Sequence, residues 1–149
     1  MLQSARVMTL AVVHEEGPWS SPVYFVYYEK VFYFFSNEAS RHIRCGLGNR
    51  VSASIFHDSD RINDIFGFQM CGRMNIVSRK TLYPAIVRRY VAKFNFLEKI
   101  FGSQVIENRH FFEEKFKSQL YCFMPDRILL SDNSQSSERR KEIDLAGLV

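Results

Sequence analysis

Short apolar runs separated by turn residues fill the first part of the chain and predict β-strands. Residues 7–13 are apolar and β-branched, and the Gly17-Pro18 pair after them favours a turn. Two further runs, residues 21–28 and 31–36, are joined only by Glu29 and Lys30. Because a connection of two residues joins antiparallel neighbours, we expect a hairpin here. The segment as a whole predicts a β-meander.

The apolar spacing becomes helical in three later segments. Residues 37–47 have Ser36 or Asn37 as a possible N-cap and predict a helix. Residues 79–94 place an apolar side chain at every fourth position from Leu82, and Pro84 is tolerated if this helix begins near Thr81. A shorter helix is expected over residues 107–115. These segments predict two or three helices.

Four later apolar runs, residues 51–56, 65–77, 119–124 and 127–131, predict the remaining strands. Gly67 and Gly72 inside the second of these runs indicate a bulge or a close approach of another chain segment. We therefore expect a mainly β (α+β) fold, an antiparallel six- to seven-stranded sheet with two or three flanking helices. One domain is expected over residues 1–133, followed by a loose polar tail over residues 134–149.

Composition narrows the class of protein. The 149 residues suit one domain, and no apolar run approaches the ~20 residues that cross a bilayer. The three cysteines are scattered and no export signal is evident, which favours reduced thiols and a cytoplasmic location. The net charge of +4 favours an anionic partner without identifying one.

The segment from Ser36 to His42 has the strongest candidate chemistry. It places two hydroxyls and two potential cations where a strand passes into a helix. Free N–H groups at a helix start, the short donors Ser36 and Ser40, and the planar guanidinium of Arg41 all suit a phosphate group. The alternative is an ordinary capped surface helix whose charged side chains face water.

The order and spacing of three motifs resemble a known family. SPVYFVYY, VFYFFSNEASRHI and NRVSASIF follow one another as in the FMN-binding split β-barrel of the pyridoxamine 5'-phosphate oxidase superfamily. In that family a Tyr-Thr pair and a Ser-Arg-Lys triplet bind the FMN phosphate, and Phe35-Ser36 and Ser40-Arg41-His42 stand at these positions here. The G-x-Q-x-x-G strand with Gln69 and the final RILLSDN segment are also similar.

The resemblance implies a cofactor, a site and an assembly. FMN would have its phosphate against Ser36, Ser40, Arg41 and His42. Its ring would lie along the strand from Pro22 to Phe25, where the backbone of Val23 and Tyr24 would bind the polar ring edge, with Gln69 nearby. Relatives bind FMN between two subunits, which implies a homodimer. The implied activity is flavin-dependent oxidoreduction of a small molecule whose identity stays open, because the oxidase's C-terminal arginine-rich signature is missing.

Other functions have weaker sequence support. A flavin- or haem-binding split barrel without turnover is the main alternative, and His14, His57 or His110 would then be candidate axial ligands. Nucleic-acid binding is unlikely, because the runs Arg88-Arg89 and Arg139-Arg140-Lys141 accompany no recognised motif. No metal site is expected, since His110 and Glu113 lack further ligands at a suitable spacing.

Overall fold

The computed structural model describes residues 2–78, 81–134 and 140–144. Its strands form one antiparallel sheet with the order β2-β1-β5-β6-β7-β4-β3, and β8 pairs with β7. The strands are β1 (Val7–His14), β2 (Gly17–Tyr24), β3 (Val26–Tyr28), β4 (Val31–Asn37), β5 (Arg50–His57), β6 (Phe66–Ile76), β7 (Ser118–Asp132) and β8 (Arg140–Ile143). The expected mainly β, antiparallel fold is confirmed, with eight described strands in place of six or seven.

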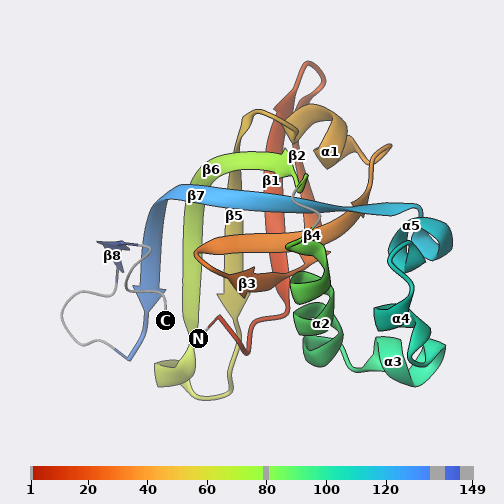
Figure 1. Ribbon diagram of the computed structural model, residues 1–149. Helices are drawn as coiled ribbons and strands as arrows, with labels where there is room; N and C mark the ends of the chain where they lie inside the picture. Colours follow the sequence, from red (N-terminus) through yellow and green to blue (C-terminus); the bar gives the residue numbers. More distant parts are fainter. Residues whose placement is uncertain (1, 79–80, 135–139, 145–149) are drawn as a thin grey trace.

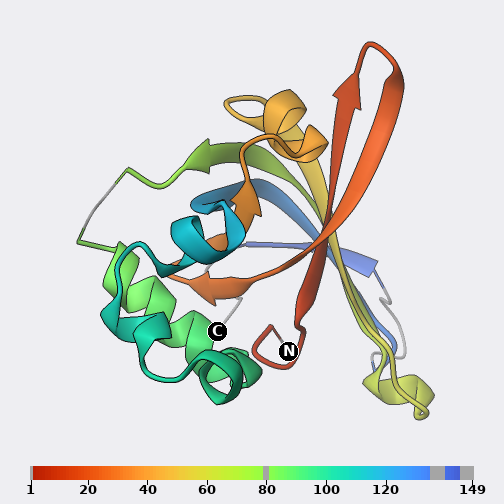
Figure 2. The same ribbon diagram turned by 90° about the vertical axis from the view of Figure 1, so that its right-hand side faces the viewer.

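The sheet curls because its two edge strands are consecutive in the chain. β2 and β3 lie at opposite ends of the strand order, yet only Phe25 separates them. The predicted single strand over residues 21–28 is therefore wrong, since the chain crosses from one edge to the other at Phe25. This crossing bends the sheet into a split barrel, from which the β1–β2 hairpin projects beside the short helix α1 (Figures 1 and 2).

Two apolar clusters lie on the two faces of β4. Phe32 and Phe34 point into the barrel, and Tyr33 and Phe35 point toward the helices. The barrel core also contains Met8, Leu10, Phe25, Ile55, Phe68, Met74, Tyr121 and Phe123. Because both faces of β4 are covered, its apolar residues form a continuous run instead of alternating with polar ones.

The described residues contain five α-helices, where two or three were expected. They are α1 (Arg41–Gly46), α2 (Tyr83–Lys93), α3 (Phe96–Phe101), α4 (Gln104–Glu107) and α5 (Phe111–Phe116), and a 3-10 turn, η1, covers Ile62–Asp64. Helices α2 to α5 gather against the β3–β4 side of the sheet (Figure 2). Pro84 lies in the first turn of α2 as predicted, although the predicted residues Arg79 and Lys80 lie outside the described residues.

The predicted first helix, residues 37–47, begins too early. Asn37 still belongs to β4, and its Oδ1 atom accepts a hydrogen bond of 2.8 Å from the backbone N–H of Ala39. This local turn delays the helix to Arg41, with Ser40 as its N-cap residue. The predicted helix over residues 107–115 likewise begins at Phe111.

Two predictions near the C-terminus are also wrong. Residues 118–132 form one strand, β7, where two strands separated by Pro125-Asp126 were expected. The register between β6 and β7 shifts between Cys71 and Gly72, and this irregularity accommodates Pro125 opposite Gly72. The tail expected to be loose includes β8, which pairs with β7 from Ile128 to Ser131.

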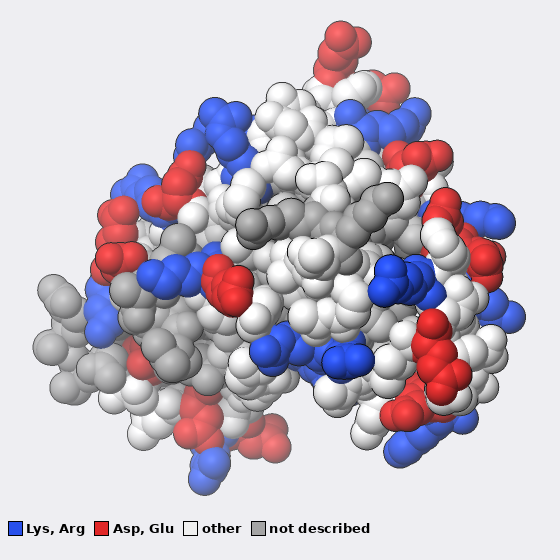
Figure 3. Space-filling view, in the orientation of Figure 1, with Lys and Arg blue, Asp and Glu red and all other residues white. Residues whose placement is uncertain are grey.

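Charged side chains of both signs are interspersed among uncharged ones on the face in Figure 3. Within the described ranges, no helix is long and apolar enough to cross a membrane.

Candidate functional site

Ser36 and His42 form a buried polar pair between the end of β4 and helix α1. A hydrogen bond of 2.8 Å joins Ser36 Oγ to His42 Nε2, and each residue is only 8% exposed. Burial lowers the pKa of His42 below its ordinary value, so the imidazole is neutral at neutral pH. The pair ties α1 to the strand, and the positive charge of this segment comes from Arg41.

Arg41 extends from α1 to the β1–β2 hairpin. Its guanidinium lies 3.0 Å from Glu16 Oε2 and 4.7 Å from the centre of the Trp19 ring. The Arg41 side chain is 26% exposed, so a ligand can reach it, whereas Glu16 is 72% exposed and is held only loosely. Stacking on Trp19 fixes the direction of the guanidinium without using its outward N–H groups.

Ser40 precedes Arg41 and keeps its hydroxyl free of helix capping. Its backbone is extended, with φ −62° and ψ 140°, and its side chain makes no cap hydrogen bond. Two hydrogen-bond donors, the Ser40 hydroxyl and the Arg41 guanidinium, thus come from adjacent residues at one corner of the barrel.

We expect the free energy of unfolding to fall as the pH drops below about 6.5, because of His42. The native pKa of His42 is lowered by burial, so the unfolded chain binds a proton in this window that the native chain does not. Urea unfolding between about pH 7 and about pH 5.5 measures the slope. The His42→Gln variant should have a smaller slope of unfolding free energy against pH. The control variant His14→Gln, at an exposed histidine, should keep the wild-type slope. An identical slope in the His42 variant contradicts the assignment.

Val23 and Tyr24 end the edge strand β2. The Val23 side chain is buried in the barrel core, and Tyr24 is 47% exposed with its ring 4.9 Å from that of Phe94. Tyr90 donates a weak hydrogen bond of 3.5 Å to the Tyr24 carbonyl. Their side chains are therefore used in packing, and β2 is an edge strand among the strands that the structure describes.

Gln69 lies on the outer face of the sheet, away from the barrel core. It lines a shallow cavity of about 490 Å³, which we name the outer hollow. The outer hollow is formed by Thr9, Ala11, Ser20, Ser52, Ala53, Ser54, Gln69, Met70, Cys71, Arg127 and Leu129. Small side chains from five strands leave this face flat and open.

The structure thus brings some predicted residues together and leaves others apart. Ser36, Ser40, Arg41 and His42 lie at one corner, whereas Gln69 lines the outer hollow and Val23 and Tyr24 lie at the opposite end of β2 from the hairpin turn. Sequence reasoning missed Glu16 and Trp19, the two neighbours of Arg41, because the hairpin pattern carries no sign of what packs against it. Among the described residues, no group of three or more side chains is arranged to hold a metal ion.

Comparison with known proteins gives one family match. The family model described as pyridoxamine 5'-phosphate oxidase matches residues 1–122. No curated protein sequence matches the chain.

Three solved structures illustrate the shared fold. Campylobacter jejuni ChuZ matches with a TM-score of 0.68 and 13% identity over 95% of this chain and 55% of its own. HutZ from Vibrio cholerae, described as a haem storage protein, has a TM-score of 0.59 and 17% identity over 85% of this chain and 86% of its own. An FAD-binding protein from Mesorhizobium loti has a TM-score of 0.60 and 14% identity over 96% and 90%. The chain thus spans about half the length of ChuZ, and at these identities the likeness shows the fold.

Proposed function

Because the chain belongs to the pyridoxamine 5'-phosphate oxidase family, we propose that it binds FMN and acts as a flavin-dependent oxidoreductase on a small molecule. The observation that carries this proposal is the pair of adjacent donors, the uncapped Ser40 hydroxyl and the accessible Arg41 guanidinium, at the barrel corner where the family holds the cofactor phosphate. The bound flavin would supply the redox chemistry, and the protein would bind and orient it.

At this corner of the barrel, side chains would contribute more to phosphate binding than the dipole of helix α1. Helix α1 has only six residues, so its macrodipole is small. The Arg41 guanidinium would exchange Glu16 for two phosphate oxygens while staying stacked on Trp19. Ser40 would donate its hydroxyl, and the Ser36–His42 hydrogen bond would hold α1 in place.

Strand β2 has a suitable length to carry the rest of the cofactor. Trp19, beside Arg41, and Tyr24 lie five residues apart on this strand, which at about 3.3 Å per residue is roughly 17 Å. The phosphate and the ring of an extended FMN would therefore lie at the two ends of β2. The backbone of Val23 and Tyr24 would bind the polar ring edge, since β2 is an edge strand of the described sheet.

We also propose that two copies pair through the outer face of the sheet. Helices α2 to α5 cover the outer face over β3 and β4, and the part of this face over β1 and β5 includes exposed apolar side chains such as Val7, Val13 and Phe56. A second copy placed there would cover Gln69 and the outer hollow and would complete the cleft for the flavin ring. The three thiols, which form no disulfide, suit a reducing compartment, so we place the protein in the cytoplasm.

A non-catalytic flavin- or haem-binding protein is the second candidate. It is favoured by the structural likeness to HutZ, which is described as a haem storage protein. His14 and His110 are exposed histidines at which an axial ligand is chemically possible.

An absorption spectrum of the purified protein, recorded before and after addition of FMN and then of haem, tests the proposal. We expect bands near about 375 and 450 nm that stay with the protein through gel filtration. The same column with light scattering should give twice the chain mass of 17.5 kDa. A Soret band near about 400 nm with no flavin retained would support haem binding instead. Retention of neither cofactor contradicts both candidates.

A further inference from the structure

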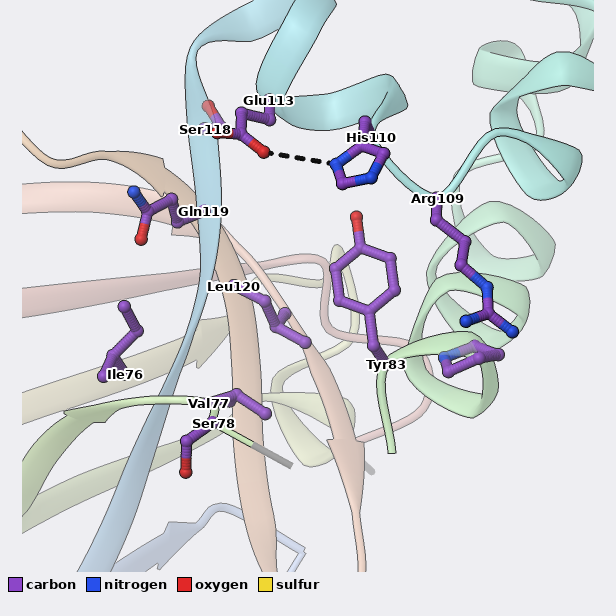
Figure 4. Close-up of a pocket in the computed structure, with 11 residues that line it drawn as sticks. Ile76, Val77, Ser78, Tyr83, Arg109, His110, Glu113, Ser118, Gln119 and Leu120 are labelled. Carbon is purple, nitrogen blue, oxygen red and sulfur yellow. Dashed lines mark hydrogen bonds and ion pairs between the residues drawn. The ribbon is translucent and has the colours of Figure 1, made fainter. Parts of the chain in front are cut away.

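A second cavity lies between the helices and the strand ends. It has a volume of about 460 Å³ and lies between the start of α2, the start of α5 and the neighbouring ends of β6 and β7 (Figure 4). Ser36, Ser40, Arg41, His42 and Gln69 are not among its lining residues. A cavity of this size that combines apolar walls with a few converging polar groups is typical of a small-molecule site.

Two hydrogen-bond donors line this cavity without a partner among the described residues. Arg109 makes no ion pair with any residue that the structure describes, and the hydroxyl of Tyr83 has no hydrogen-bond partner in the same set. Figure 4 shows the Tyr83 hydroxyl pointing toward the ring of His110. Burial, together with the charge of Glu113, raises the pKa of Tyr83, so its phenol keeps the proton that it can donate.

His110 is oriented by Glu113. The His110 Nδ1 atom lies 3.5 Å from Glu113 Oε2, a contact between positions three apart in the chain. This contact favours the tautomer that has its proton on Nδ1, which leaves Nε2 for a ligand. Tyr83, Arg109 and His110 together make one side of the cavity polar, and Arg109 gives it a positive charge.

The opposite side of the cavity is apolar. Ile76 at the end of β6, Val77 just after it and Leu120 of β7 form this wall. The edge of the Tyr83 ring packs against Phe35, with ring centres 6.0 Å apart, so the phenol is held in place from behind. A flat apolar molecule could lie between this wall and Tyr83.

We propose that this cavity binds a flat organic molecule with a single carboxylate. The carboxylate pairs with Arg109 and accepts a hydrogen bond from Tyr83, and the apolar body lies on Ile76, Val77 and Leu120. Glu113 also lines the cavity, and its charge selects against a ligand with two negative charges. The cavity therefore favours a carboxylate over a phosphate monoester.

Three naphthalene derivatives of similar shape test this proposal: 1-naphthoate, the neutral 1-naphthamide and 1-naphthyl phosphate. Titrations followed by the NMR signals of Tyr83, His110 and Leu120 give an affinity for each probe. We expect 1-naphthoate to bind about tenfold more tightly than 1-naphthamide and more tightly than the phosphate. Equal affinity for the carboxylate and the amide, or signal changes elsewhere in the protein only, overturns the proposal.

Matched variants separate the cavity from general charge attraction. Arg109→Gln should remove the preference for the carboxylate, whereas Arg88→Gln, which removes an exposed cation from α2, should leave it unchanged. Tyr83→Phe removes an unpartnered hydroxyl, so the fold is kept and the carboxylate affinity falls by about threefold. An Arg109 variant that keeps the full preference contradicts the assignment. These outcomes are independent of FMN, whose binding is measured separately.

Discussion

Replacing Arg41 with alanine is expected to weaken FMN binding by about 1.5–3 kcal/mol, or roughly 10- to 150-fold. Arg41 is the only cation among the residues assigned to the phosphate, because burial keeps His42 neutral. Alanine removes a charge-assisted contact with two phosphate oxygens. Flavin fluorescence quenching, titrated with FMN, measures the loss of affinity.

Two comparisons isolate the phosphate contact. Arg44→Ala removes an exposed cation from the last turn of the same helix and should leave the FMN affinity within about twofold. Riboflavin, which has no phosphate, should bind the wild type and the Arg41 variant equally. An Arg41 variant that binds FMN as tightly as the wild type would exclude Arg41 from the phosphate site.

The second large effect is expected at Gly72, where β6 and β7 come close. A Cβ atom at Gly72 would clash with the backbone carbonyl oxygen of Met124 and would lie 2.6 Å from the Cα atom of Pro125. Moving either backbone atom would disrupt the pairing of β6 with β7 at their register shift. We expect Gly72→Ala to lower the free energy of unfolding by about 3 kcal/mol or more, measured by urea denaturation.

Gly67 of the same strand offers a matched control. A Cβ atom there would lie 3.4 Å from the nearest atom, the Ile55 carbonyl oxygen. Gly67→Ala should therefore change stability by less than about 1 kcal/mol, and a gain is possible because alanine restricts the unfolded chain. If both variants unfold at the same urea concentration as the wild type, the close approach at Gly72 is wrong.

The sequence pattern predicts most strands, because the side chains along each strand are either buried alternately or buried almost throughout. Residues 7–13, 31–36, 51–56 and 65–77 were expected as strands and lie within two residues of β1, β4, β5 and β6. The split of residues 21–28 at Phe25 could not be predicted, because Phe25 is as apolar as its neighbours and only the closing of the barrel makes it cross between edges. Pro125 was misleading for the opposite reason, since a bulge accommodates the proline within one strand.

The sequence predicts which segment forms the candidate site, but it does not predict how the side chains of that segment are arranged. The hydroxyls and cations between Ser36 and His42 point to phosphate from their chemistry alone. Their division of roles depends on tertiary packing, which buries Ser36 and His42 as a pair and leaves Arg41 accessible. The cavity beside α5 had one sequence signal, the spacing of His110 and Glu113. Arg109 and Tyr83 join that pair only through the packing of α2 against α5 and β7.

The position of β7 in the sheet has a consequence for the order in which the chain folds. β7 is the longest strand, and it inserts between β6 and β4, which are completed much earlier in the sequence. Until residues 118–132 have been synthesised, the sheet consists of two separate pieces, β2-β1-β5-β6 and the β3–β4 hairpin. The edge of β4 that pairs with β7 is then unpaired, and the barrel core beside Phe32 and Phe34 still lacks Tyr121 and Phe123. Such late, long-range pairing slows folding and makes the nascent chain prone to aggregation before release from the ribosome.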